Sequence, residues 1–326
     1  MTLLYTDPTF RLHLTGSHPE NPRRLVSIET RLQEAGLTEK CTRPPCPAAS
    51  LEQLQRMHDA AYIKQVEDYA AAGGGRIESD TVVSKRSYEA ARLAAGAACD
   101  AAKRVISGED TTALCLSRPP GHHARPHDAM GFCLFNNVAV AARAAIVEHA
   151  VDRVLIVDWD VHHGNGTQEM FWEDGQVGFF SIHRWPFYPG SGDREETGSG
   201  RGLGWIVNEP VAMGTSRKVY HERFERALID LAAKVRPQLV IVSAGFDAHR
   251  EDPIGSLGLE VEDFAQLTKT VQNVANEYCS SRLVSVLEGG YNAGKLAESV
   301  EVHLRCLLGE TKLGLPKSET PGERPE

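Results

Sequence analysis

The sequence predicts an α/β protein in which a mainly parallel sheet is flanked by helices. Five apolar runs lack polar alternation, which is typical of strands that are buried on both faces of a sheet. Helical stretches separate these runs, as expected where crossover helices join parallel strands. The 326 residues are enough for one large domain, and no internal repeat or linker divides them.

Helix signals appear before and between the apolar runs. Asn21 is expected to cap a helix that has Pro22 at its first position and ends at Gly36. Ser50 begins a capping-box pattern that predicts a second helix, extending toward Tyr69. Alanine-rich stretches predict further helices at about 87–107 and 136–149.

The apolar runs are the predicted strands, at 112–117, 154–158, 177–182, 239–245 and 283–290. Each run leads into polar or titratable residues, in the order "RPPGHHA", "DWDVHHGNG", "HRWPFYPGSGD", "FDAHREDP" and "EGGYN". Ligands of open parallel sheets bind beyond the carboxyl ends of the strands. We therefore expect these five segments to meet at one site.

Composition narrows the class of protein. The net charge of −9 argues against a general nucleic-acid binder. The N-terminal residues lack the pattern of a signal peptide, and no run reaches transmembrane length. The seven cysteines are scattered without a CxxC pair, which indicates neither a disulfide framework nor a zinc knuckle. We expect a reduced, cytoplasmic protein without nucleic-acid or membrane partners, and a homo-oligomer is left open.

The "DWDVHHGNG" segment carries candidate metal ligands. Residues two apart in an extended segment point the same way, so Asp160 and His162 can reach one cation. Asp247, after a second strand, could be a third ligand. Three protein ligands leave room for water and substrate, as in a catalytic site. Two carboxylates and one imidazole are a harder donor set than most zinc sites have, so Fe²⁺ or Co²⁺ could also occupy it. The alternative is that the aspartates cap neighbouring helices.

"RPPGHHA" places His122 and His123 together on a stiff loop. A metal-activated water needs a base, and a leaving amine needs an acid, so two differently tuned imidazoles could divide this work. A carboxylate partner raises the pKa of a histidine, whereas an amide partner does not. Asp158 and Asn165 are available for these two positions.

Aromatic residues complete the candidate site. Tyr291, in "EGGYN", could donate a hydrogen bond to the oxyanion that forms from a substrate carbonyl. Phe132 and Tyr188 could form the walls of a narrow channel. Each of the three, considered alone, is more often a core residue.

In the order and content of these motifs the sequence resembles the histone deacetylase family, in its class II-like bacterial branch. The segments "HPENPRR", "RPPGHHA", "GFCLFNNVAVAA", "DWDVHHGNGTQ", "GFDAH" and "EGGYN" carry the resemblance over roughly residues 10–300. It implies the arginase/deacetylase fold, which is a single domain with an eight-stranded, mainly parallel sheet. The catalytic domain is expected at 1–309, and a polar, disordered tail at 310–326.

The resemblance implies roles for individual residues. The implied metal ligands are Asp160, His162 and Asp247, and the implied catalytic residues are His122, His123, Tyr291, Asp158 and Asn165. The class I-like pattern has an aspartate where this chain has Asn165. Phe132 and Tyr188 match the walls of an acyl-lysine tunnel that Gly131 and Gly290 are expected to adjoin. Arg24 resembles the arginine of the family's internal cavity.

Structural potassium ions are implied by the resemblance alone. A near site would use Asp158, Ser181 and the main-chain carbonyls of Asp160, His162 and Ile182. A distant site would use main-chain carbonyls around Phe171, Asp174, Val177 and Trp205.

The sequence thus predicts a zinc-dependent amidohydrolase that deacylates acetyl-lysine in a peptide or protein. An acetylpolyamine or other small-molecule amidohydrolase is the alternative in the same chemistry. An enzyme of this kind would benefit from an acidic residue at the rim of its site. Ile254 stands at the relevant position and argues against this alternative, whereas the nearby Glu251 and Asp252 leave it open.

Two other classes fit the residues less well. A binuclear ureohydrolase needs bridging carboxylates in DxHxD and DxD segments, but Gly164 and His249 stand where two of these carboxylates would be. A non-catalytic acyl-binding protein would not need Tyr291 and an intact histidine pair.

Overall fold

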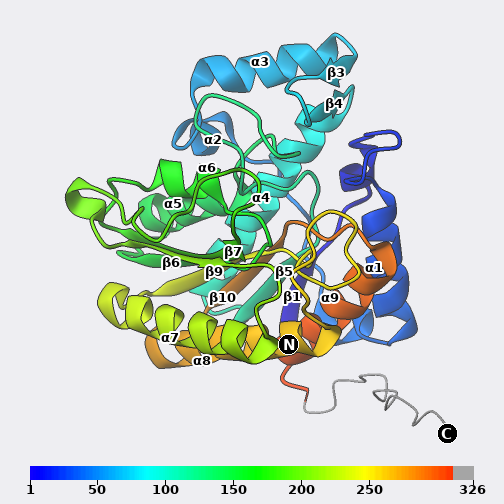
Figure 1. The fold of residues 1–326 in the computed structure, drawn as a ribbon. Coiled ribbons are helices and arrows are strands. Elements are labelled where there is room, and N and C mark those ends of the chain that lie inside the picture. Colours follow the sequence, from blue (N-terminus) through cyan, green and yellow to red (C-terminus); the bar gives the residue numbers. More distant parts are fainter. Residues whose placement is uncertain (311–326) are drawn as a thin grey trace, which may run out of the picture.

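One parallel sheet forms the centre of residues 1–310, which are the residues that the computed structural model describes (Figure 1). Eight strands in this part of the chain follow the order β2-β1-β5-β10-β9-β6-β7-β8, and each neighbouring pair is parallel. The strands are β1 (Thr2–Tyr5), β2 (Cys41–Thr42), β5 (Thr112–Cys115), β6 (Val154–Asp158), β7 (Val177–Arg184), β8 (Ile206–Val211), β9 (Leu239–Ala244) and β10 (Leu283–Leu287). This confirms the predicted single α/β fold.

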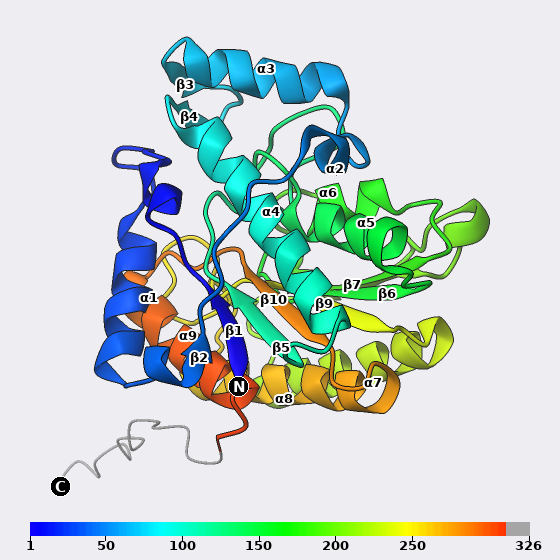
Figure 2. The ribbon, with the colours of Figure 1, turned by 180° about the vertical axis from the view of Figure 1, so that it is seen from behind.

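Helices cover both faces of this sheet. On one face lie α4 (Ser87–Ile106) and α5 (Asn137–His149), side by side in Figure 2. The other face packs against α7 (Arg217–Val235), α8 (Val261–Tyr278) and α9 (Ala293–Leu307), and α9 also contacts α1 (Arg23–Glu34). Beyond the sheet lie α2 (Leu51–Gln55), α3 (Ala60–Ala71), α6 (Asn165–Met170) and the antiparallel hairpin of β3 (Gly74–Arg76) and β4 (Val82–Ser84). Among residues 1–310, no helix has the length and apolar character needed to span a bilayer.

The five predicted strands are confirmed as β5, β6, β7, β9 and β10. Every residue of β6, β9 and β10 is buried, which explains why their sequences lack polar alternation. The edge strands β2 and β8 were not among the apolar runs. β8 contains Pro210 and two polar residues, which an edge strand tolerates because one side of its backbone is unpaired.

The predicted helix start and the predicted second helix both need correction. Pro22 is the N-cap of α1 rather than its first residue, although Asn21 Oδ1 still accepts a hydrogen bond from the Arg23 N–H. The capping box of Ser50 and Gln53 is confirmed, but that helix ends at Gln55 and α3 begins separately.

Tertiary contacts explain the break between α2 and α3. The His58 ring accepts a hydrogen bond from the Asn136 N–H at 2.9 Å and lies 2.9 Å from the Arg125 carbonyl oxygen. The Asp59 N–H donates to the Pro126 carbonyl at 2.8 Å. The Asp59 N–H thus bonds to the segment after β5 rather than to the preceding helical turn, whereas the His58 N–H still donates to the Leu54 carbonyl at 2.8 Å. Apart from Glu310, the predicted tail at 310–326 lies outside the described residues.

Candidate active site

The strand order brings the predicted site residues together. β5, β10, β9 and β6 are neighbours in the sheet, and the segments that follow their carboxyl ends carry the histidine pair, Tyr291, Asp247 and Asp160. The register pairs Asp158, the last residue of β6, with Ser243 in β9. Side chains from distant parts of the sequence therefore meet at one edge of the sheet.

Asp160, His162 and Asp247 form a buried cluster in which one ligand atom from each residue lies within 4.8 Å of the others. His162 Nδ1 lies 3.0 Å from Asp160 Oδ1 and 3.1 Å from Asp247 Oδ2. Asp247 Oδ2 is nevertheless buried without a hydrogen-bond partner. Burial and the nearby Asp160 charge raise the pKa of Asp247 to about 7. A cation would relieve this crowding of carboxylates, so the three side chains fit a divalent metal.

Backbone amides orient these ligands. The His162 and Gly289 N–H groups donate to the two oxygens of Asp160 at 2.9 and 2.8 Å. The Val161 N–H donates to Asp247 Oδ1 at 2.9 Å. A Cβ added at Gly289 would lie 2.2 Å from Asp247 Oδ2 and 2.5 Å from Asp160 Oδ2, so this position requires glycine. The sequence reasoning missed this requirement, although the "EGG" motif was its signal.

The two adjacent histidines have different partners, as predicted. His122 Nδ1 lies 2.9 Å from Asp158 Oδ2, and His123 Nδ1 lies 2.8 Å from Asn165 Oδ1. The Asn165 amide nitrogen donates toward Met130 Sδ at 3.3 Å, which turns its oxygen toward His123. His123 therefore donates from Nδ1, and its Nε2 is left as an acceptor.

The surroundings of the two imidazoles shift their pKa values in opposite directions. Burial alone would lower the pKa of His122, but the charges of Asp158 and Asp160 outweigh burial and raise it to about 10. Burial and the neighbouring imidazoles of His122 and His162 hold the pKa of His123 well below its usual range. One ring is thus suited to remain a cation and the other to accept a proton.

Glu288 fixes the loop that carries the pair, and the sequence reasoning did not single it out. Its fully buried carboxylate accepts hydrogen bonds from the Gly121 N–H at 2.7 Å and the His122 N–H at 3.2 Å. The loop after β5 is therefore tied to the end of β10.

A narrow cavity of about 250 Å³ leads to these groups. Its lining residues are Asp80, His123, Gly131, Phe132, His162, Phe187, Tyr188, Ile254 and Tyr291. The ring of Phe132 meets that of Tyr291 edge to face, with centroids 5.8 Å apart, and Tyr188 meets His123 similarly at 5.3 Å. Burial and the charges of Asp247 and Asp160 raise the pKa of Tyr291 well above its usual value, so its hydroxyl stays protonated.

Sequence reasoning missed two of the lining residues. Phe187 stacks on the His162 ring at 5.3 Å, and its signal was its place in "PFYPG" after β7. Asp80 comes from the β3–β4 hairpin and accepts a hydrogen bond from the Gly131 N–H at 3.2 Å. No pattern near Asp80 indicated a site. Gly290 lies outside the lining, where its carbonyl accepts a hydrogen bond from Arg24 Nε at 2.7 Å.

The residues of the predicted potassium sites lie at two places around β7. Asp158 and Ser181 are paired across β6 and β7, and Ser181 Oγ lies 2.9 Å from His183 Nδ1. At the other end of β7, Asp174 Oδ1 accepts a hydrogen bond from the Val177 N–H at 3.2 Å. Of the remaining residues, Ile182 follows Ser181 in β7, Asp160 and His162 follow β6, and the Phe171 and Trp205 carbonyls accept hydrogen bonds from the Asp174 and Phe179 N–H groups.

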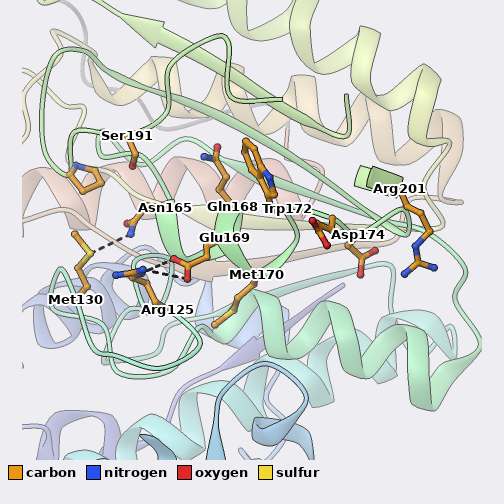
Figure 3. Close-up of a pocket in the computed structure, with 12 residues that line it drawn as sticks. Arg125, Met130, Asn165, Gln168, Glu169, Met170, Trp172, Asp174, Ser191 and Arg201 are labelled. Atoms are coloured by element: carbon orange, nitrogen blue, oxygen red, sulfur yellow. Dashed lines mark hydrogen bonds and ion pairs between the residues drawn. The ribbon is translucent and has the colours of Figure 1, made fainter. Parts of the chain in front are cut away.

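A second, larger hollow of about 830 Å³ has Met130 and Asn165 among its lining residues (Figure 3). Asn165 also contacts His123, which lines the narrow cavity. Arg125 pairs with Glu169 within the larger hollow, and Arg201 lies at its other end. Neither the metal-ligand cluster nor the histidine pair lines this hollow. The chemistry therefore belongs to the smaller cavity.

Comparisons with known proteins agree with this geometry. Residues 18–307 match the family model described as the histone deacetylase domain. The chain is 42% identical to a histone deacetylase-like amidohydrolase of Pseudomonas aeruginosa over 275 residues, which are 84% of this chain and 72% of the relative. It is 40% identical to the human polyamine deacetylase HDAC10 over 323 residues, which are 94% of this chain and 46% of that protein.

A solved structure supports the same assignment. The crystal structure of the HDA15 HD domain superposes with a TM-score of 0.89 at 36% identity, covering 95% of this chain and 89% of that one. The family model spans nearly all of the described residues, and its match agrees with the sheet, the buried Asp-His-Asp cluster and the histidine pair. This chain belongs to the histone deacetylase family.

Proposed function

We propose that this protein is a zinc-dependent deacylase that hydrolyses the amide of acetyl-lysine in peptides or proteins. The observation that carries the proposal is the shared cavity. His123, Tyr291 and the metal-ligand residue His162 all line one narrow space with aromatic walls. A base, an oxyanion donor and a metal site so placed suit the attack of water on an acyl carbonyl.

Asp160, His162 and Asp247 would hold the zinc ion. When bound, it would polarise the acyl carbonyl and lower the pKa of the attacking water. Potassium at the two places beside β7 is a further part of the proposal, supported by family membership and the buried residues there.

His123 makes both proton transfers, while Tyr291 and His122 stabilise the negative charge that develops. His123 Nε2 takes a proton from the water because its Nδ1 proton is held by Asn165. The Tyr291 hydroxyl donates to the developing oxyanion. The cationic His122 ring, held by Asp158, stabilises negative charge in the transition state. The proton on His123 then passes to the leaving amine.

The cavity favours a lysine-like chain as substrate. Its aromatic walls suit an apolar methylene stem, and the half-buried Asp80 carboxylate adds an acceptor for a substrate N–H. The name of the human relative supports a polyamine alternative. A polyamine enzyme would benefit from an acidic residue at the rim, but here the apolar Ile254 lines the cavity. Both oxygens of the nearby Asp252 already accept hydrogen bonds from backbone N–H groups.

The test is turnover by enzyme that has been stripped with a chelator and reloaded with one metal at a time. Acetyl-lysine peptides, acetylpolyamines and longer acyl-lysines should be compared at equal metal occupancy. We expect the stripped enzyme to be inactive and zinc or cobalt to restore hydrolysis, with the highest kcat/KM on acetyl-lysine peptides. Higher kcat/KM on acetylpolyamines would overturn the substrate, and full activity without metal would overturn the mechanism.

The Asn165→Asp variant tests the assignment of His123 as the base. An anionic partner should raise the pKa of His123, which the neutral amide leaves low. The base must be deprotonated in the free enzyme, so the acidic limb of the kcat/KM profile should move to higher pH. The measurement is kcat/KM against pH at constant metal occupancy, with Gln266→Glu, at an exposed position on α8, as a remote control that adds the same charge. An unmoved or lowered limb would mean that Asn165 does not act on the base.

A further inference from the structure

The carboxylate of Asp252 joins two loops that both line the narrow cavity. Its Oδ1 accepts hydrogen bonds from the Ile254 and Gly255 N–H groups, each at 2.9 Å. Its Oδ2 accepts from the Tyr291 N–H at 2.7 Å and the Asn292 N–H at 3.3 Å. Ile254 and Tyr291 are both walls of the cavity, so one side chain connects two of its walls.

Asp252 is itself held in place by burial and by a hydrogen bond of its own backbone. The residue is only 7% exposed, and its N–H donates to the His249 carbonyl at 3.0 Å. An ionised carboxylate has acceptor positions for about four donors and no donor of its own, which matches the four N–H groups around it. Charge-assisted bonds of this kind are stronger than those between neutral groups.

The backbone on either side of Tyr291 is also held, because Arg24 Nε donates to the Gly290 carbonyl at 2.7 Å and Asn292 is the N-cap of α9. Gly290, immediately before it, has φ +121° and lacks a Cβ that would restrict the chain. On the ring, the contacts are the edge-to-face packing of Phe132 and the Arg24 guanidinium, 5.1 Å from the ring centroid. These contacts orient the ring, whereas Asp252 accepts the hydrogen bond of the Tyr291 N–H itself and ties it to the Ile254 loop.

We propose that Asp252 is a positioning residue that holds the Tyr291 hydroxyl where it can reach the reacting carbonyl. This inference rests on the proposed function. An amide at this position would offer one acceptor atom and would turn an NH₂ group toward two N–H donors. The Tyr291 loop would then shift, and small displacements of a catalytic group are costly in rate.

The experiment is a double-mutant cycle of Asp252→Asn and Tyr291→Phe on an acetyl-lysine peptide. In the wild-type background we expect Asp252→Asn to lower kcat by about 10²-fold. In the Tyr291→Phe background, where no hydroxyl remains to be misplaced, the same change should lower kcat by less than about threefold. Equal losses in the two backgrounds would overturn the inference, because Asp252 would then act elsewhere.

A spectroscopic measurement makes the test independent of turnover. With 3-fluorotyrosine at position 291, the ¹⁹F resonance should be a single line in the parent protein and should shift or broaden in Asp252→Asn. An unchanged resonance would contradict the proposal. Glu298→Gln, which neutralises a carboxylate on α9 that pairs with Lys295 at 3.2 Å, is the control and should leave both readouts unchanged.

The variants also separate this inference from its premise. Zinc content should be equal in all of them, and Asp252→Ser provides a second, smaller replacement. If neither Asp252 variant folds, the residue supports the fold as a whole and the positioning role is wrong. If the wild-type enzyme hydrolyses no acyl-lysine, the proposed function fails, while additive losses in an active enzyme overturn the role of Asp252 alone.

Discussion

Asp247→Ala is expected to abolish both tight zinc binding and hydrolysis of acetyl-lysine. The change removes one of three protein ligands and leaves Asp160 and His162, which cannot hold a catalytic metal firmly by themselves. A metal supplies several kcal/mol of transition-state stabilisation, so kcat/KM should fall by at least about 10³-fold. The measurements are metal content after gel filtration and turnover at a fixed concentration of free zinc.

Thermal unfolding gives a second readout of the same change. For the wild-type protein, zinc at 100 times its Kd should add about 2.7 kcal/mol to the free energy of unfolding. The Tm of the variant should not respond to zinc. Asp230→Ala, which removes an exposed carboxylate on α7, should behave as wild type. A full complement of tightly bound metal in Asp247→Ala would show that the metal site lies elsewhere.

Tyr291→Phe is expected to lower kcat by about 10²–10³-fold, which is the usual loss for one oxyanion donor. The phenylalanine ring keeps the packing against Phe132 and loses only the hydroxyl. Zinc content and KM should change little, because the lost bond forms mainly in the transition state. Steady-state kinetics on an acetyl-lysine peptide, at matched zinc content, measure this.

A matched hydroxyl deletion controls for general effects of that substitution. Tyr278→Phe removes a phenol at the end of α8 and should leave kcat unchanged. A near-wild-type kcat for Tyr291→Phe would mean that the hydroxyl does not face the reacting carbonyl. The proposed division of work between Tyr291 and His123 would then be wrong.

Local patterns in the sequence were sufficient for the elements that depend on local forces. The bare apolar runs predicted the five central strands, because strands buried on both faces admit few polar residues. The capping box at Ser50 predicted a helix start, because its bonds join residues three apart. The same locality explains the failures, since the break after Gln55 depends on bonds to the distant Asn136 and Pro126.

The sequence by itself also predicted the side chains of the candidate site, because it fixes which side chains follow each strand. Only the tertiary structure decided how these side chains act on one another. The parallel order β5-β10-β9-β6 places Asp247 beside Asp160, where Asp247 Oδ2 is buried without a hydrogen-bond partner. Burial among different neighbours then drives the pKa values of His122 and His123 apart. Electrostatic and hydrogen-bond energies depend on the distance between groups in space. Strand order and register set that distance, whereas spacing along the chain does not.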